Sequence, residues 1–341
     1  MAEYYFSLPP EGDLTIDQRS ALNEPNPIAL SGGPGTGKSV VSLYRHLNLN
    51  KTGTSCQLLT YTTTLATYLK SCASNINNVA GNNIKSSYRW MQNPSKFDEI
   101  IVDEAQDMPE DYHESLKRYS KRISYGADDA QILYPEKSTK QNRLHQLFDN
   151  RGYRLGRNFR STKKIMLFAK QAFPNARIDS ETIDNIKEDG ILPRLLISNG
   201  SNYVVSNEKQ DNAIIELITS LTNDTTNIAV LLPWKPQVEY FNNLINKAFP
   251  NSTYYFEDRT RFPRGCEHLS NVHCTTFKSS KGLEFDVVIM PNFHRVTEAN
   301  GNFNVDWQDY YVAVTRAKSN LFLISNNNIP SLNLVSEKIQ L

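Results

Sequence analysis

A glycine-rich stretch between an apolar run and a helical segment is the first feature that could do chemistry. The stretch is PIALSGGPGTGKS, residues 27 to 39, and it leads into VVSLYRHL. In a strand-to-helix context the spacing GxxxxGK[ST] predicts a loop whose N–H groups converge on phosphate oxygens at a helix N-terminus. Lys38 would place positive charge on the β- and γ-phosphates, and Ser39 would offer an oxygen ligand to Mg²⁺. We therefore expect Mg-ATP to bind here, with the loop formed by Gly32, Gly33, Pro34, Gly35, Thr36 and Gly37.

A second group of chemical residues follows another apolar run, EIIVDEAQD, at residues 99 to 107. The run is typical of a buried parallel strand. Asp103 at its end would hold Mg²⁺, and Glu104 would polarise the water that attacks the γ-phosphate. Taken alone, such an acidic cluster is more often a solvated turn. Together with the glycine-rich loop, it predicts the second half of a nucleotide site.

These residues must be positioned by a fold of more than one domain, since 341 residues exceed the usual domain size of about 150. Apolar runs alternate with helical patterns, which indicates an α/β fold with parallel sheets wound by helices. We expect two domains, residues 1–147 and 148–341. In such folds ligands bind at the carboxyl ends of the strands, so ATP is expected in the cleft between the domains.

Composition narrows the cellular setting. Lys and Arg number 37 against 36 Asp and Glu, so a nucleic-acid groove would have to be a local feature. No apolar run is long enough to span a bilayer, and the start of the chain lacks the pattern of a signal peptide, which predicts a cytoplasmic protein without membrane contact. The four cysteines show no CxxC pairing. A zinc site needs four converging ligands, and side chains of suitable type are present at Cys266, His268, His273 and Cys274. His273 and Cys274 are adjacent on an expected strand, so their side chains point to opposite faces, which disfavours zinc.

The order of the motifs resembles superfamily-one helicases of the UvrD/Rep type. The resemblance covers most of the chain and rests on LTIDQRSAL, GGPGTGKS, LTYTTT, DEAQD, ADDAQILY, LGRNFRS, TTFKSSKGLEFDVVIMP and YYVAVTRAK. It implies two RecA-like P-loop NTPase domains and ATP-driven movement along a nucleic-acid strand.

The resemblance implies roles near the base and the γ-phosphate. Gln18 would make a bidentate contact to the adenine edge, and Gln131 would sense the γ-phosphate. For Gln18 a plainer alternative is open, namely a helix capped by Thr15 or Asp17 on which Gln18 is merely exposed.

The resemblance also implies that the second domain completes the site. Arg160 and Arg316 would act as arginine fingers, while Gly282 and Glu284 would face the nucleotide and its ribose. Phosphoryl transfer accumulates charge on the γ-phosphate oxygens, and an added guanidinium contributes about 10³- to 10⁵-fold in rate. Delivered by a second domain, that charge would make hydrolysis depend on closure.

Nucleic-acid contacts follow from the same resemblance. The expected residues are phosphate donors, cations and stacking aromatics: Thr60, Tyr61, Thr62, Arg89, Trp90 and Lys278. For Trp90 a role as a core aromatic is an equal alternative. Lys278 replaces a His that is frequent in the family, and Pro135 to Ser138 stand where an aromatic, base-stacking stretch is common.

Two functions remain open at this point. The first is an ATP-dependent single-stranded DNA translocase or helicase, with 3′ to 5′ polarity by analogy. The second is a nucleotide-gated switch that binds a protein partner, such as a nuclease or other effector of an antiviral defence module. Gaps from about residue 70 to 99 and from 161 to 271 leave no room for both accessory subdomains of the UvrD-like family, so a stripped core is expected.

Overall fold

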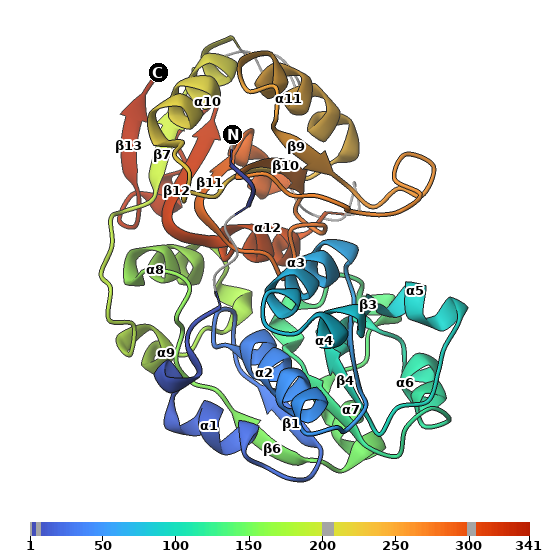
Figure 1. The fold of residues 1–341 in the computed structure, drawn as a ribbon. Helices are drawn as coiled ribbons and strands as arrows, with labels where there is room; N and C mark the ends of the chain where they lie inside the picture. Colours follow the sequence, from blue (N-terminus) through green and yellow to red (C-terminus); the bar gives the residue numbers. More distant parts are fainter. Residues whose placement is uncertain (1, 5–7, 200–207, 299–304) are drawn as a thin grey trace. The chain divides into compact units, whose positions relative to one another are not determined.

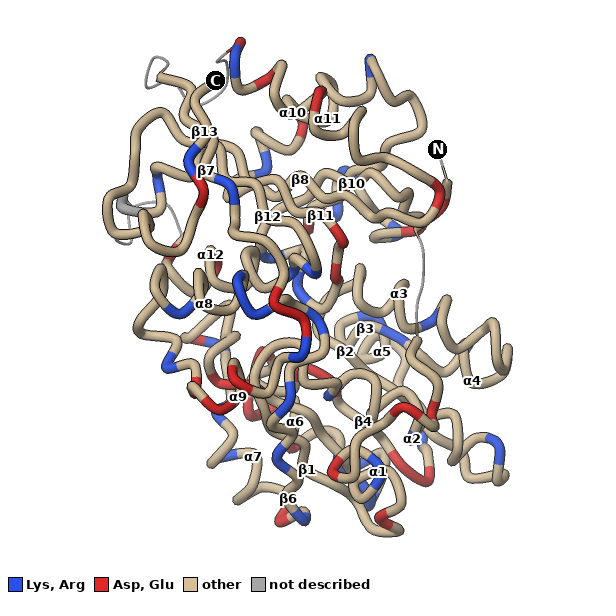
Figure 2. The backbone as a smooth tube through the Cα atoms, turned by 90° about the vertical axis from the view of Figure 1, so that its left-hand side faces the viewer, with Lys and Arg blue, Asp and Glu red and all other residues tan. Residues whose placement is uncertain are grey.

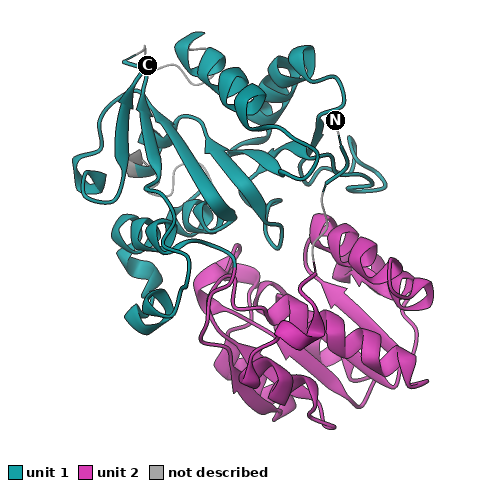
Figure 3. Ribbon diagram, turned by 60° about the vertical axis from the view of Figure 1, so that its left-hand side comes forward, with its two compact units in different colours: residues 1–5, 160–341 teal, residues 6–159 magenta. Residues whose placement is uncertain are grey.

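The computed structural model describes residues 2–4, 8–199, 208–298 and 305–341. The chain forms two compact units, coloured separately in Figure 3. Unit 2 comprises residues 6–159, and unit 1 comprises residues 1–5 and 160–341. The division falls after Phe159 rather than after residue 147, because strand β6 (Arg151–Arg154) pairs with the strand that leads into the glycine-rich loop.

Unit 2 is built on one six-stranded parallel sheet with the order β3-β2-β4-β5-β1-β6. Its strands are β1 (Ile28–Ser31), β2 (Cys56–Thr60), β3 (Ile84–Ser86), β4 (Glu99–Asp103), β5 (Ile123–Gly126) and β6. Its helices are α1 (Ile16–Leu22), α2 (Lys38–Lys51), α3 (Thr63–Ser74), α4 (Asn78–Asn82), α5 (Ser87–Gln92), α6 (Glu110–Leu116) and α7 (Gln141–Phe148), with short 3-10 turns at Glu11–Asp13, Ala105–Asp107, Asp129–Gln131 and Pro135–Lys137. Strands β2, β4 and β5 are buried throughout, as parallel strands between helices are.

The strand order brings the chemical motifs to one edge of this sheet. Only β5 lies between β1, which leads into the glycine-rich loop, and β4, which ends in the carboxylates. Because parallel strands end at the same edge, the residues that follow β1, β4 and β5 are neighbours there.

Unit 1 contains a seven-stranded parallel sheet with the order β13-β7-β12-β11-β8-β10-β9. Its strands are β7 (Arg194–Ile197), β8 (Ile228–Leu232), β9 (Thr253–Tyr255), β10 (Val272–Thr276), β11 (Phe285–Met290), β12 (Ala317–Ser325) and β13 (Glu337–Gln340). Its helices are α8 (Lys163–Ala172), α9 (Ser180–Asp184), α10 (Glu208–Leu221), α11 (Lys235–Ala248) and α12 (Trp307–Val314), with 3-10 turns at Pro174–Ala176, Phe293–Glu298 and Pro330–Leu332. The expected α/β fold class, with two units built on parallel sheets, is confirmed.

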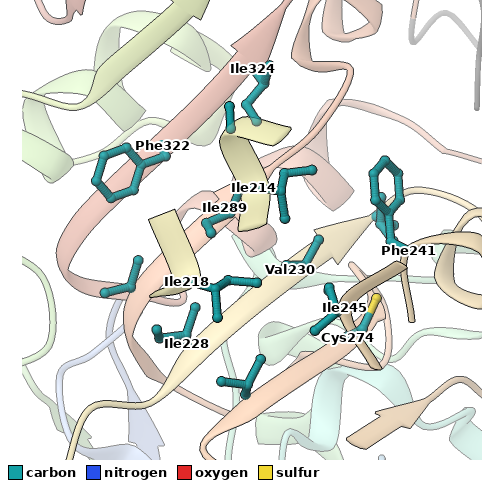
Figure 4. Packing of buried hydrophobic residues seen from close by; sticks show 14 of the residues in the cluster. Ile214, Ile218, Ile228, Val230, Phe241, Ile245, Cys274, Ile289, Phe322 and Ile324 are labelled. Atoms are coloured by element: carbon teal, nitrogen blue, oxygen red, sulfur yellow. The ribbon is translucent and has the colours of Figure 1, made fainter. Parts of the chain in front are cut away.

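The core of unit 1 forms where α10 and α11 cover one face of the sheet (Figures 1 and 4). Ile214 and Ile218 are four residues apart on α10, so both point to the same side of that helix. They pack with Val230 of β8 and Ile289 of β11, all fully buried. The helical spacing of apolar residues in this part of the sequence therefore corresponds to a true buried face.

The first residues of the chain belong to unit 1. Glu3 and Ser270 form an antiparallel bridge, and the Tyr4 amide donates to the Leu269 carbonyl at 3.0 Å. The Tyr4 ring meets Phe285 edge to face, and its hydroxyl donates to the main-chain carbonyl of Glu284. Burial raises the pKa of Tyr4 well above its usual value, so this hydroxyl remains a donor.

Basic and acidic residues are interspersed along the backbone of both units (Figure 2). In the part of the chain that the structure describes, no helix has the length and apolar character needed to cross a bilayer.

Candidate nucleotide-binding site

The glycine-rich loop joins β1 to α2 and needs glycine at two of its positions. Gly37 has φ of 90°, and a Cβ there would lie 2.3 Å from the amide nitrogen of Gln18. Gly32 has φ of 139°, and a Cβ there would lie 2.3 Å from the Leu155 carbonyl oxygen. Both positions combine a conformation that favours glycine with close approach of other groups. The loop therefore has the compact shape that phosphate binding requires.

Lys38 begins α2, and its side chain turns back along the loop. Its Nζ lies 2.6 Å from the carbonyl oxygen of Gly32 and 3.0 Å from that of Gly33. The side chain is 7% exposed. A buried ammonium at the N-terminus of a helix supplies positive charge where the helix N–H groups also favour an anion.

Gln18 lies against this loop. Its Oε1 accepts from the Thr15 amide at 2.9 Å in a capping box at the start of α1, and its Nε2 donates to the Thr36 carbonyl at 2.9 Å. Thr15 thus caps the helix, but Gln18 is 4% exposed rather than on the surface. The amide supports the phosphate loop directly, and its contact with adenine stays a prediction.

Asp103 ends β4 with a carboxylate suited to a metal. Both carboxylate oxygens are buried and have no hydrogen-bond partner among the described residues. Burial raises the pKa of Asp103 to about 7, the Glu104 charge also raises it, and the adjacent Ser39 hydroxyl and the Lys38 ammonium act in the opposite direction. A buried carboxylate without a partner is costly unless a cation joins it. Asp103 and Ser39 would therefore offer Mg²⁺ the oxygen ligands that it prefers.

Glu104 follows in a left-handed conformation, with φ of 57° and ψ of 41°. Its Oε2 accepts from the Gln106 amide at 2.6 Å. This bond helps to orient the Glu104 carboxylate next to Asp103. The two neighbouring carboxylates therefore lie in different surroundings.

The end of β5 adds residues that the sequence reasoning missed. A Cβ on Gly126 would lie 3.3 Å from Oδ1 of Asp103, so glycine leaves space beside the carboxylate. Asp128 Oδ2 lies 3.9 Å from Nζ of Lys38 and accepts from the Gln131 amide at 2.6 Å. The signal was present, because GADD ends an apolar strand in carboxylates just as DEAQD does.

In unit 1 the structure brings Arg160 and Glu284 together. Arg160 Nε lies 3.1 Å from Oε2 of Glu284, and its Nη1 donates to the Thr315 carbonyl at 3.4 Å. Gly282, in the turn before Glu284, has φ of 83°. Arg160 is therefore bound by the Glu284 carboxylate and by the main-chain carbonyl just before Arg316.

Arg316 is itself buried at 1% exposure. Its Nε donates to the Val312 carbonyl at 2.9 Å, and its Nη1 donates to the Leu283 carbonyl at 3.2 Å. The guanidinium thus ties α12 to the turn before Glu284. Its role as an arginine finger stays a prediction.

The expected nucleic-acid contacts differ widely in exposure. Arg89 is exposed on α5, and Tyr61 packs beside Tyr134 with ring centroids 6.0 Å apart. Thr62 caps α3 by accepting from the Leu65 amide at 3.2 Å. The Thr60 side chain is wholly buried.

Two further contact candidates have partners within the protein. Trp90 has no exposed surface and meets the Tyr119 ring at 5.2 Å, so the alternative of a core aromatic describes it, and its ring offers no face to a base. Lys278 Nζ lies 3.8 Å from Oδ2 of Asp309 at the start of α12.

The cysteine and histidine pattern does not form a metal site. In the ranges that the structure describes, no three His, Cys, Asp or Glu side chains are grouped so as to hold a metal ion. A hydrogen bond of 2.9 Å joins Nδ1 of His273 to the Thr253 hydroxyl, while the Cys274 thiol donates to the Val238 carbonyl.

Family models match both halves of the chain. Residues 27–182 match the model described as Schlafen group 3, DNA/RNA helicase domain, and residues 193–328 match the model described as AAA domain. The two halves of the chain are thus similar to a helicase domain model and to an AAA domain model.

A curated relative is the RecBCD enzyme subunit RecB of Chlamydia pneumoniae, which is 32% identical over 92 residues. The match covers 27% of this chain and only 9% of that relative's length.

Solved structures of helicases show weaker likeness. The C-terminal domain of a possible DNA helicase from Lactobacillus plantarum WCFS1 is 19% identical, covering 53% of this chain and 98% of that chain, with a TM-score of 0.38. The arterivirus nonstructural protein 10 helicase is 13% identical, and the match covers 91% of this chain and 61% of that chain, with a TM-score of 0.46. The PRRSV helicase is 14% identical, and the match covers 91% of this chain and 54% of that chain, with a TM-score of 0.47.

Proposed function

We propose that this chain is an ATP-dependent translocase or helicase of the UvrD/Rep type that acts on single-stranded DNA with 3′ to 5′ polarity. The observation that carries the proposal is the buried, unpartnered Asp103 carboxylate beside Ser39 and Lys38. These groups follow β4 and β1, which have only β5 between them, in a part of the chain that matches a helicase domain model. The four buried cysteines form no disulfide in the part of the chain that the structure describes, which is compatible with a cytoplasmic location.

The residues of unit 2 would bind ATP and prepare the attack. Lys38 and the loop amides would hold the β- and γ-phosphates, while Ser39 and Asp103 would hold Mg²⁺. When bound, Mg²⁺ would neutralise charge on the phosphate oxygens. Glu104, oriented by Gln106, would accept a proton from the attacking water.

The residues of unit 1 would make hydrolysis depend on both units. Arg160 and Arg316 would stabilise the charge that develops on the γ-phosphate, and Gly282 and Glu284 would contact the nucleotide. The support is the motif order and the Arg160–Glu284 pair at 3.1 Å. Since a guanidinium acts mainly on transition-state charge, its loss should lower turnover more than binding.

The direct test is ATP hydrolysis by the purified chain with no nucleic acid, with oligothymidine, with oligouridine and with blunt duplex DNA. A motor couples its two sites, so single-stranded DNA should raise turnover. Coupling of the two binding equilibria is reciprocal, so a non-hydrolysable ATP analogue should change DNA affinity by about 5- to 150-fold and DNA should change the analogue's affinity by the same factor. Lys38→Ala serves as the control for contaminating ATPases. Equal rates in all four conditions would contradict the motor.

The second candidate is a nucleotide-gated switch for a protein partner such as a nuclease or effector. It is favoured by the burial of Thr60 and Trp90 and by the pairing of Lys278 with Asp309, which leave few of the expected contacts exposed. A switch would hydrolyse ATP slowly, and its ATPase rate would not change when single-stranded nucleic acid is added. Pull-downs with the Glu104→Gln variant in ATP, compared with Lys38→Ala, would identify a partner that binds the ATP state alone.

A further inference from the structure

The segment that leads to Arg160 runs alongside the phosphate loop. After β6, the Leu155 amide donates to the Ser31 carbonyl at 2.8 Å. The Asn158 side chain then donates through Nδ2 to the Pro34 carbonyl at 2.8 Å, and the Phe159 amide donates to the Gly35 carbonyl at 2.8 Å. Three hydrogen bonds within unit 2 thus join the residues before Arg160 to the end of β1 and to two residues of the loop.

The physical reason for these bonds lies in the shape of the loop. When the N–H groups of a phosphate loop converge on an anion, its carbonyls turn outward and need donors of their own. Asn158, at 3% exposure, supplies one to Pro34. Of the three bonds it is the one made by a side chain, so a substitution can remove it while the main chain stays intact.

We propose that Asn158 is a positioning residue through which the phosphate loop holds Arg160, so that nucleotide in the loop and placement of the arginine are coupled. The inference rests on the proposed function and adds the route of coupling. Two residues span at most about 7 Å of extended chain, so a shift of the Pro34 and Gly35 carbonyls is passed on with little slack. At the other end, Arg160 is held by Glu284 and the Thr315 carbonyl.

Asn150 provides a matched control on the same stretch of chain. It is likewise buried, and its Nδ2 donates to the Ile123 carbonyl at 2.7 Å and the Ile28 carbonyl at 3.2 Å. These bonds tie strands at their amino ends, away from the loop carbonyls. Asn150→Ala therefore reports what loss of a buried amide does to folding alone.

The experiment is a double-mutant cycle between Asn158→Ala and Arg160→Ala, repeated with Asn150→Ala. For each variant, ATP turnover per folded molecule, the Kd of a fluorescent ATP analogue and the unfolding midpoint are measured. In the wild-type background we expect Asn158→Ala to lower kcat by about 10- to 100-fold with the analogue's Kd within about threefold. In the Arg160→Ala background it should lower kcat no further, because its effect passes through that arginine. Asn150→Ala should leave kcat per folded molecule unchanged in both backgrounds.

Two outcomes would overturn the inference: the same fold-loss of kcat from Asn158→Ala in both backgrounds, or equal losses in kcat and in analogue binding. The proposed function fails in a different way, when Arg160→Ala by itself leaves kcat at the wild-type value.

A measurement on the unaltered protein covers the case in which Asn158→Ala does not fold. Hydrogen exchange of the peptide containing Phe159 and Arg160 is followed with and without a non-hydrolysable ATP analogue, with Lys38→Ala as the variant that should not respond. We expect the analogue to change exchange of this peptide in the wild type alone. No change in the wild type would overturn the coupling.

Discussion

Nζ of Lys38 lies 3.9 Å from Oδ2 of Asp128, and the same carboxylate oxygen accepts from the amide of Gln131 at 2.6 Å. One carboxylate at the end of β5 therefore stands between the residue proposed to hold the phosphates and the residue proposed to sense them. Its other oxygen accepts from the Ala130 amide at 3.0 Å, which fixes its orientation.

Asp128→Asn should uncouple this arrangement. The substitution keeps the shape but removes the charge opposite Lys38 and puts a donor where Gln131 needs an acceptor. We expect kcat for ATP to fall about 10- to 100-fold, with a smaller change in nucleotide Kd, since the residues placed by Asp128 act on the γ-phosphate. The matched control is Asp129→Asn, because Asp129 accepts from the Gln141 amide at the start of α7. Equal effects of the two changes would show that Asp128 only supports the local turn.

Substitutions of Lys38 and Glu104, the basic and the acidic residue that we assign to hydrolysis, should affect nucleotide binding and turnover differently. Lys38→Ala removes the phosphate counter-charge and should abolish both nucleotide binding and hydrolysis. Glu104→Gln should retain binding and block turnover, since the amide cannot accept a proton from water. Isothermal titration with an ATP analogue and a phosphate-release assay measure the two quantities. If Glu104→Gln hydrolysed ATP near the wild-type rate, another group would have to activate the water.

Local sequence patterns predicted the parts of this molecule that depend on neighbours in the chain. The apolar runs before Gly32 and Asp103 predicted buried strands, and both strands are buried in parallel sheets. The glycine spacing predicted the strand, loop and helix that the structure shows from Ile28 to Lys51.

What the sequence could not reveal are bonds between distant segments. Asn158 reaches Pro34 across 124 positions, and the burial of Gln18 depends on its bond to Thr36. Trp90 had equal claims as a core or a stacking residue, and only its packing against Tyr119 decides between them. The boundary after Phe159 likewise follows from the pairing of β6 with β1, which no local pattern encodes.

Buried neutral histidines should make the fold sensitive to acid. Burial lowers the pKa of His113 from 6.5 to about 4, despite its bond to the Ala105 carbonyl, which acts in the opposite direction. The unfolded chain then takes up the proton first, so this contribution to the free energy of unfolding is full above pH 6.5 and is lost as the pH falls toward about 4.

Denaturant unfolding at pH 7 and pH 5 measures the effect. His113→Gln should reduce the loss of stability between these two pH values by at most about 2 kcal/mol, because only the interval from pH 6.5 down to pH 5 contributes, at about 1.36 kcal/mol per pH unit. His145 is exposed on α7, so His145→Gln should leave the loss unchanged. The same loss in all three proteins would contradict the role of His113.

The isolated chain should separate duplex DNA poorly even if single strands stimulate its ATPase. Breaking paired, stacked bases costs on the order of 1.4 kcal/mol per step, and efficient unwinding needs a second surface that holds the duplex. Of the expected contacts, Trp90 is buried and Lys278 is paired with Asp309, so DNA binding should be weak and sensitive to salt. A strand-displacement assay on a tailed duplex, without partner proteins, tests this. Rapid, processive unwinding would mean that other residues hold the DNA.

We propose that Arg160 and Arg316 of unit 1 act on the γ-phosphate of ATP bound by the phosphate loop of unit 2, and the variant Arg160→Ala provides the sharpest test. Turnover and nucleotide Kd are measured on the same preparation, with Arg157→Ala as the control, because Arg157 stacks on the Phe159 ring at 4.8 Å. We expect Arg160→Ala to lower kcat by about 10³-fold or more while the Kd stays within about threefold. A kcat equal to that of Arg157→Ala, or a Kd that rises as much as kcat falls, would contradict it.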